Sequence, residues 1–244
     1  MIILNSIHSD SALIHPSSIL EGEIHLEEGV EIGPYCHLIG PLRIGKNSII
    51  SSYCYIKGPA IIGERNRFNP NCVIGTQPES KGKDATGSIS IGNDNTFTEF
   101  TVITHGTSRE GTRIGDGNFF LRNVHISHDC NLGNDVTLAH NVVLAGHVSV
   151  QDGANIGISS SIHQFSTIGA YSMIGMNSVV TKDIPPFVLA FGNPVKFQRW
   201  NSYQLKKLGI EDIPSGEIYE KYNLEFHSTT RRSVLPIDLA ETTN

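Results

Sequence analysis

A large apolar residue recurs at every sixth position through most of this 244-residue chain. The repeat runs in three registers, from Ile14 to Ile74, from Ile91 to Ile103 and from Ile114 to Val180. A period of six fits neither the 3.6-residue turn of an α-helix nor the two-residue alternation of a simple strand. It fits a coil with three short flat faces, in which each hexad forms one face and its large residue points inward. The sequence therefore predicts an all-β solenoid of many rungs.

The four cysteines fit the same geometry. Cys36, Cys54 and Cys72 are spaced by three hexads, so we expect them to stack on one inward column in successive coils. Neighbouring strands lie about 4.8 Å apart, whereas the Cβ atoms of a disulfide lie about 3.8 Å apart. Small buried thiols are therefore favoured over disulfides. Cys130 falls in the same inward class, and no Cys-x-x-Cys spacing typical of a zinc site occurs.

Two polar stretches break the repeat, residues 76–90 and 104–113, and we expect them to be loops that carry binding residues. The repeat ends at Val180, after which we expect an extended segment and then short helices over 202–208 and 215–226. The predicted domains are a β-helix catalytic domain over 1–196, which includes both loops, and a short helical segment and tail over 197–244.

Several histidines share one edge of the predicted solenoid. When residue numbers are divided by 18, His163, His128, Gly146 and His147 give remainders of 1 to 3, and His125 gives 17. No histidine of this set occupies an inward position, which disfavours buried core histidines, and a functional cluster is favoured over solvated surface histidines. His140 falls elsewhere on the coil and is expected to be a surface residue.

Two chemistries could use such a cluster. Three imidazoles could bind one zinc ion, as in the carbonic anhydrases built on this type of repeat, but the His-x4-His spacing of those enzymes is absent. Alternatively, one neutral histidine could act as a general base, flanked by groups that position substrate and stabilise an oxyanion. General base chemistry is favoured over a metal site.

Four local sequences then occur in order, namely Val124–Cys130 (V-H-I-S-H-D-C), Leu144–Val150 (L-A-G-H-V-S-V), Ile162–Phe165 (I-H-Q-F) and Ala190–Asn193 (A-F-G-N). Together they resemble the acyl-carrier-protein-dependent UDP-N-acetylglucosamine O-acyltransferases of lipid A biosynthesis, a family of hexapeptide-repeat acyltransferases. The resemblance implies a left-handed parallel β-helix with a short C-terminal helical extension, assembled as a homotrimer. It implies transfer of an acyl or hydroxyacyl group from acyl carrier protein to the 3-position of a UDP-GlcNAc-like sugar, with no cofactor.

The resemblance also implies roles for individual residues. His128 would be the catalytic base, Asp129 would orient it, and the Gly146 N–H would stabilise the oxyanion. Donor and acceptor contacts would come from a larger set, namely His125, His147, His163, Gln164, Asn193, Arg199, Glu79 and Lys81. Met173 and Met176 would limit the length of the acyl chain and favour shorter donors. A basic patch for the acidic carrier protein could draw on Arg109, Arg113, Arg122, Lys196, Arg199, Lys206 and Lys207.

The sequence departs from the family pattern in three places. The first loop has Thr104-His105-Gly106-Thr107 where the family has His-Arg-Gly-Thr, so a histidine is replaced or displaced. The family's Asp-x-Lys is matched only by Glu79 and Lys81, with a one-residue gap. The region after Gly209 is shorter than the family's helical domain. These departures affect acceptor recognition more than the base.

Charge and composition exclude some binding partners and indicate where the protein is located. A net charge of -6 disfavours binding to nucleic acid or to an anionic membrane, because both need a concentrated basic surface. No run of 18 apolar residues and no signal-peptide pattern occurs, so a cytoplasmic location is expected. Two other functions stay open, a coenzyme A-dependent sugar-nucleotide N-acyltransferase and a non-enzymatic β-solenoid scaffold. The histidine cluster argues against the scaffold.

Overall fold

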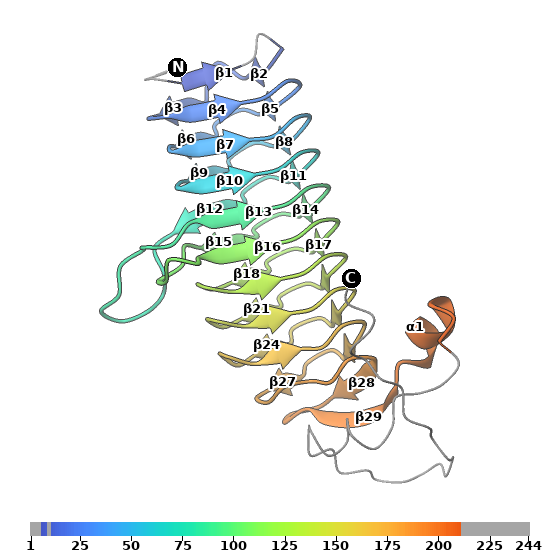
Figure 1. Cartoon of the computed structure of the whole chain (residues 1–244). Helices are drawn as coiled ribbons and strands as arrows, with labels where there is room; N and C mark the ends of the chain where they lie inside the picture. Colours follow the sequence, from blue (N-terminus) through green and yellow to red (C-terminus); the bar gives the residue numbers. More distant parts are fainter. Residues whose placement is uncertain (1–5, 9–10, 211–244) are drawn as a thin grey trace.

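The computed structural model describes residues 6–8 and 11–210, which form a column of stacked triangular coils (Figure 1). Three sheets make the three faces of the column. Sheet A contains β3 (Ile19–Glu21), β6 (His37–Ile39), β9 (Tyr55–Lys57), β12 (Val73–Thr76), β15 (Val102–Thr104), β18 (His125–Ile126), β21 (Val143–Leu144), β24 (Ser161–Ile162) and β27 (Val179–Val180).

Sheet B contains β1 (Ser6–His8), β4 (Ile24–Leu26), β7 (Leu42–Ile44), β10 (Ala60–Ile62), β13 (Ile89–Ile91), β16 (Thr112–Ile114), β19 (Asn131–Leu132), β22 (Ser149–Val150) and β25 (Thr167–Ile168). Sheet C contains β2 (Leu13–Ile14), β5 (Glu31–Ile32), β8 (Ile49–Ile50), β11 (Arg67–Phe68), β14 (Thr96–Phe97), β17 (Phe119–Phe120), β20 (Thr137–Leu138), β23 (Asn155–Ile156), β26 (Met173–Ile174), β28 (Val188–Phe191) and β29 (Lys196–Trp200). The chain visits the sheets in the order C, A, B in each coil, and the strands within a sheet pair in parallel except β28 with β29. The predicted class, a left-handed parallel β-helix of hexapeptide repeats, is confirmed.

The large residue of each hexad forms the core, as the repeat predicts. On sheet C, for example, Phe68, Phe97 and Phe120 are fully buried and pair in register across neighbouring strands. Their ring centroids are 4.5 Å apart for the first pair, which is stacked, and 5.3 Å for the second, which is edge-on. The four cysteines are free and lie in the same core, and Cys36 donates its thiol hydrogen to the carbonyl of Ser51 at 2.8 Å.

Both breaks in the repeat are loops at one corner of the triangle, the turn that leads from sheet A to sheet B. We call it the A–B corner. The first loop connects β12 to β13 and projects away from the column, and the second connects β15 to β16 beside it (Figure 1). The strand register continues across both, because Ile74 pairs with Ile103 and Ile103 pairs with Ile126. The extra residues therefore lengthen only this corner and leave the core unchanged.

The C-terminal end of the column is closed by a hairpin that the sequence analysis did not predict. β28 adds to sheet C beside β26, and β29 runs back antiparallel to it, across the predicted boundary at residue 196. Helix α1 (Ser202–Lys207) follows, close to the expected 202–208, and the Asn201 side chain caps its N-terminus. The helix expected over 215–226 lies outside the described residues. Among the described residues, no helix has the length and apolar character needed to cross a membrane.

Candidate active site

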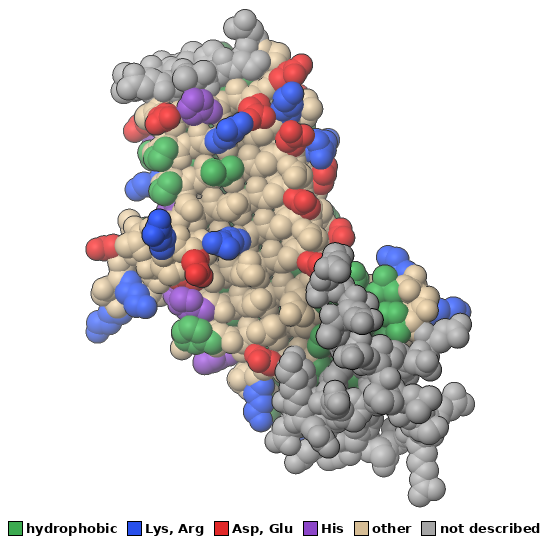
Figure 2. All heavy atoms as spheres, viewed as in Figure 1, with side chains coloured by type: hydrophobic (Ala, Val, Ile, Leu, Met, Phe, Trp, Pro, Cys, Tyr) green, Lys and Arg blue, Asp and Glu red, His purple; other side chains and the backbone are tan. Residues whose placement is uncertain are grey.

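The candidate site is built from the A–B corner in successive coils. Three consecutive turns of this corner carry His128 and Asp129, then Gly146 and His147, then His163 with its neighbours. The two loops described above occupy the same corner in the two preceding coils. Figure 2 shows histidine side chains on the surface just below the projecting loop. The turns place these residues together because each starts at the end of a sheet A strand and stacks on the one before it.

His128 and Asp129 form a hydrogen-bonded pair. Nδ1 of His128 lies 2.9 Å from Oδ2 of Asp129, and the two side chains are 12% and 3% exposed. A carboxylate can only accept, so the ring donates its Nδ1 hydrogen and keeps Nε2 free as a proton acceptor. Asp129 has a φ of 59°, in the left-handed region that short polar residues tolerate best. This geometry would suit a histidine that acts as a general base.

The second loop surrounds the Asp129 carboxylate with hydrogen-bond donors. Thr107 donates to Oδ2 from its backbone N–H at 3.0 Å and from its hydroxyl at 2.8 Å. Ser108 donates to Oδ1 from its backbone N–H at 2.9 Å and from its hydroxyl at 2.6 Å. Burial by itself would raise the pKa of Asp129, but the hydrogen bonds from Ser108, His128 and Thr107 outweigh it and hold this pKa well below its usual range. The carboxylate is therefore ionised at neutral pH.

Gly146 lies directly under the imidazole of His128. A Cβ built on Gly146 would collide with the ring of His128, so only glycine allows this approach. Its carbonyl accepts a hydrogen bond from the N–H of Phe165. Its own N–H has no hydrogen-bond partner within the described part of the chain. A free N–H next to the base could donate to a developing oxyanion.

His147 is held between two rings. Its ring is edge-on to His128 with centroids 5.2 Å apart and stacks on Phe165 at 4.6 Å. Its Nε2 lies 3.7 Å from Oδ2 of Asp129. Phe165 is otherwise exposed. Sequence reasoning missed Phe165, although its place in the turn one coil after His147 could have indicated it.

His125 contacts the projecting loop. It is on β18, and its Nε2 lies 3.3 Å from Oε2 of Glu79 without hydrogen-bond geometry. The structure therefore brings Glu79 to the candidate site, whereas Lys81 is exposed on the same loop. His163 and Gln164 are exposed in the turn of the third coil, where Nδ1 of His163 lies 3.1 Å from the carbonyl oxygen of Gln164.

His105, the histidine at the altered loop motif, does not join the candidate site. It is 3% exposed, and neither ring nitrogen has a hydrogen-bond partner among the described residues. Its pKa is lowered because burial disfavours the charged ring. It packs near Gly75 at the base of the first loop.

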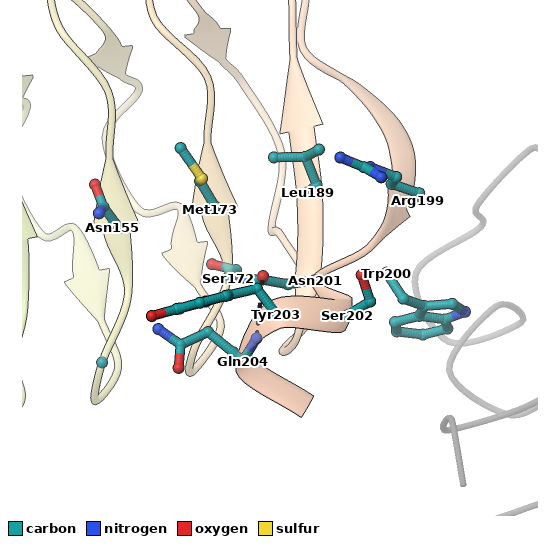
Figure 3. Close-up of a pocket in the computed structure, with 11 residues that line it drawn as sticks. Asn155, Ser172, Met173, Leu189, Arg199, Trp200, Asn201, Ser202, Tyr203 and Gln204 are labelled. Carbon is teal, nitrogen blue, oxygen red and sulfur yellow. Dashed lines mark hydrogen bonds between the residues drawn. The ribbon is translucent and has the colours of Figure 1, made fainter. Parts of the chain in front are cut away.

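Four residues proposed from the sequence lie away from this corner in a single chain. Met173 is on sheet C and Met176 follows it in the turn toward sheet A, while Asn193 and Arg199 belong to the β28–β29 hairpin. All four side chains are exposed. Met173 and Arg199 help line a cavity of about 280 Å³ between sheet C and α1 (Figure 3).

The cavity nearest the dyad is smaller and polar. It measures about 150 Å³ and is lined by Ser108, Glu110, Gly111, Arg113, Asp129, Asn131 and His147. Of the basic residues expected to bind a carrier protein, Arg113 lines this cavity, whereas Arg122 pairs with Glu99 at 2.9 Å.

The dyad and His147 could in principle form a metal site, since their ligand atoms lie within 4.8 Å of one another. The hydrogen bonds argue against this use. Nδ1 of His128 is committed to Asp129, and both carboxylate oxygens already accept hydrogen bonds from Thr107 and Ser108. A metal at Asp129 would have to displace donors that the fold supplies from its backbone, so these residues fit an acid–base pair better than a metal.

Comparisons with known proteins agree on one family. The family described as "Bacterial transferase hexapeptide (six repeats)" matches residues 41–76 and 111–146. The acyl-[acyl-carrier-protein]–UDP-N-acetylglucosamine O-acyltransferase of Paraburkholderia phytofirmans is 42% identical over 200 residues, covering 81% of this chain and 76% of that protein. The protein of the same name from Thermodesulfovibrio yellowstonii is 39% identical and covers 87% and 84%.

Solved structures give the same result. The UDP-N-acetylglucosamine O-acyltransferase of Moraxella catarrhalis superposes with a TM-score of 0.72 at 33% identity, covering 83% of this chain and 77% of that one. The UDP-N-acetylglucosamine acyltransferase of Campylobacter jejuni gives 0.72 at 31% identity and covers 89% and 82%.

Proposed function

The chain belongs to the family of acyl-[acyl-carrier-protein]–UDP-N-acetylglucosamine O-acyltransferases, and we propose that it catalyses the reaction in that name. An acyl or hydroxyacyl group passes from the thioester of acyl carrier protein to the 3-hydroxyl of a UDP-GlcNAc-like sugar. The observation that carries the proposal is the His128–Asp129 pair, whose bonded Nδ1 leaves Nε2 free as a base. The cytoplasmic location expected from the sequence stays a prediction.

The reaction begins with the acceptor hydroxyl. A sugar hydroxyl is a weak nucleophile, so its proton must leave as its oxygen attacks the thioester carbonyl carbon. Nε2 of His128 takes that proton, and the ionised Asp129 stabilises the imidazolium that results. The Gly146 N–H is a candidate donor to the tetrahedral oxyanion, because it lies beside the base and has no other partner among the described residues. Collapse of the intermediate breaks the C–S bond, and the leaving thiolate takes the proton from His128.

Acceptor binding is assigned to the residues that line the approach to the dyad. His147 is adjacent to the base, and His125 with Glu79 forms the side nearest the first loop. His163 and Gln164 extend the same corner by one coil. Lys81 lies exposed on the same loop as Glu79, and we assign it to acceptor binding as well.

The remaining assigned residues require a second subunit. Asn193, Arg199 and Met176 lie on other faces of the column than His128, so they can join the site only from a neighbouring copy of the chain. We therefore propose a homotrimer with cyclic symmetry and active sites between subunits.

The direct test is incubation of the purified protein with UDP-GlcNAc and a panel of acyl-carrier-protein and coenzyme A thioesters. Mass spectrometry of the products should show an O-acylated sugar nucleotide formed from the carrier-protein thioesters. An acylated product formed only from coenzyme A thioesters, or none at all, would contradict the proposal.

A further inference from the structure

The Asp129 carboxylate is unusually well supplied with donors. It accepts five hydrogen bonds, one from His128 and four from two consecutive residues of the second loop. Thr107 binds Oδ2, the oxygen that also accepts from His128, and Ser108 binds Oδ1. Both oxygens are therefore fixed, and the plane of the carboxylate is fixed as a result. Neither loop residue was indicated by the repeat, because the loop lies outside the hexad register.

The loop itself is locked in place. Thr86, at the end of the first loop, donates its hydroxyl hydrogen to the carbonyl of Thr107 at 2.6 Å, and its N–H bonds the carbonyl of Gly106 at 3.1 Å. A Cβ on Gly106 would lie 2.5 Å from Cα of Gly111 and 2.7 Å from Oδ1 of Asp129. The two loops and the turn of Asp129 are therefore packed backbone against backbone, and the hydroxyls of Thr107 and Ser108 have little freedom to turn away.

We propose that Thr107 and Ser108 are positioning residues of the acyl transfer, which hold the Asp129 carboxylate and through it set the orientation of His128. The inference rests on the proposed function, in which His128 is the base. The four donors from the loop keep the carboxylate ionised and fix its plane, so the ring that donates to Oδ2 is fixed with it.

The effect of removing a hydroxyl follows from these hydrogen bonds. Without the Thr107 hydroxyl, Oδ2 keeps only the Thr107 N–H and the His128 ring as donors, so the carboxylate plane and the ring that it holds are less firmly fixed. Proton transfer then starts from a poorer geometry, so kcat must fall while the sugar nucleotide still binds.

The test compares Thr107→Val, which keeps the shape and the backbone N–H but loses the hydroxyl, with Thr107→Ser, which keeps the hydroxyl. Ser108→Ala tests the other oxygen. We expect Thr107→Val to lose about tenfold in kcat, as for one hydrogen bond to a charged group. The KM for UDP-GlcNAc should stay within about twofold. Thr107→Ser should restore kcat, and Thr137→Val, an equivalent change on sheet C, should leave both kcat and KM unchanged.

The resonance of His128 provides a readout that does not need activity. The ring can be labelled at Cε1 with ¹³C and identified by its loss in His128→Gln, and at a fixed pH its signal should shift in Thr107→Val and return toward the wild-type position in Thr107→Ser. Unchanged kinetics and an unchanged resonance in both Thr107→Val and Ser108→Ala would overturn the proposal, as would a loss of activity confined to KM. A wild-type protein without acyl transfer would instead contradict the proposed function, while a shifted His128 resonance would still support the positioning role.

Discussion

His128 is fixed from two sides by contacts that leave only one of its nitrogens available. Asp129 holds Nδ1, and the absence of a side chain at Gly146 lets the ring lie flat against the next coil. His147 then borders the open edge of the ring. A histidine held in this way loses little freedom when it takes a proton, because its orientation is already set in the free protein.

Replacement of His128 by alanine should abolish most turnover without unfolding the protein. The side chain lies at a corner of the column and not in its core, so its loss removes few packing contacts. General base catalysis typically contributes about 10²- to 10⁴-fold, and a loss of that size in kcat is expected. His140→Ala, a change at another corner, is the matched control and should keep wild-type activity. Retention of more than half the wild-type rate by His128→Ala would remove this residue from the role of base.

Replacement of Gly146 by alanine should be nearly as damaging, for a different reason. The backbone at Gly146 does not require a positive φ, so alanine fits the turn itself, but its Cβ would collide with the His128 ring. The ring must move away from its place, and we expect kcat to fall by about 10²-fold although the N–H is still present. Steady-state kinetics with a circular dichroism melt will separate this effect from unfolding. An active Gly146→Ala protein with wild-type kcat would show that the ring has room to move.

At the scale of elements, the A–B corner explains why a repeat protein carries a localised site. Both interruptions of the hexad and the turns of His128, His147 and His163 all follow strands of sheet A. Because each coil has nearly the same number of residues, the repeat places loops and histidines from distant parts of the sequence at one edge.

The sequence could predict only those parts of the fold and of the candidate site that follow the hexad register. The hexad period predicted the core, the column of cysteines and the shared edge of the histidines, because residues in register differ by a fixed number. The loops have no period, so their contacts could not be predicted, and Thr107 and Ser108 were missed although they bind the carboxylate that accepts from His128. The β28–β29 hairpin was missed because it lies beyond the last hexad. His105 looked like a displaced site residue and is instead buried under the loops.

The turn between β26 and β27 is the element expected to measure the acyl chain. Met176 is 67% exposed there, and a long apolar side chain can close a channel without burying a polar group. We expect the wild type to prefer shorter acyl donors and Met176→Gly to shift the optimum toward longer ones. Each excluded methylene forfeits about 0.8 kcal/mol of burial, so a chain two carbons too long should be rejected about tenfold or more.

The measurement is a profile of kcat/KM against the chain length of the acyl-carrier-protein donor. Ile158→Gly is the matched control, since Ile158 is exposed in the same turn one coil earlier and its loss should leave the profile unchanged. A Met176→Gly profile that overlays that of the wild type would show that Met176 does not set chain length.

At the scale of the whole molecule, the cavity beside the dyad in residues 11–210 of one chain is too small for the proposed substrates. The cavity next to the dyad measures about 150 Å³, whereas sites for small molecules usually measure about 300–1,000 Å³. A sugar nucleotide and an acyl chain together need more space than this cavity provides. We expect another copy of the chain to supply the missing wall, because Asn193, Arg199 and Met176 lie on faces that His128 does not share.

We therefore predict that the active protein is a closed trimer. Three identical columns related by a cyclic axis would each place one A–B corner against another face of a neighbour. This arrangement gives three equivalent sites and leaves no contact surface without a partner. Light scattering at assay concentration should report three times the 26.6 kDa of one chain. Specific activity should fall on dilution if the trimer dissociates, and it should recover on reconcentration. A monomer that keeps full activity at assay concentration would refute the shared site, because every residue needed for turnover would then belong to a single column.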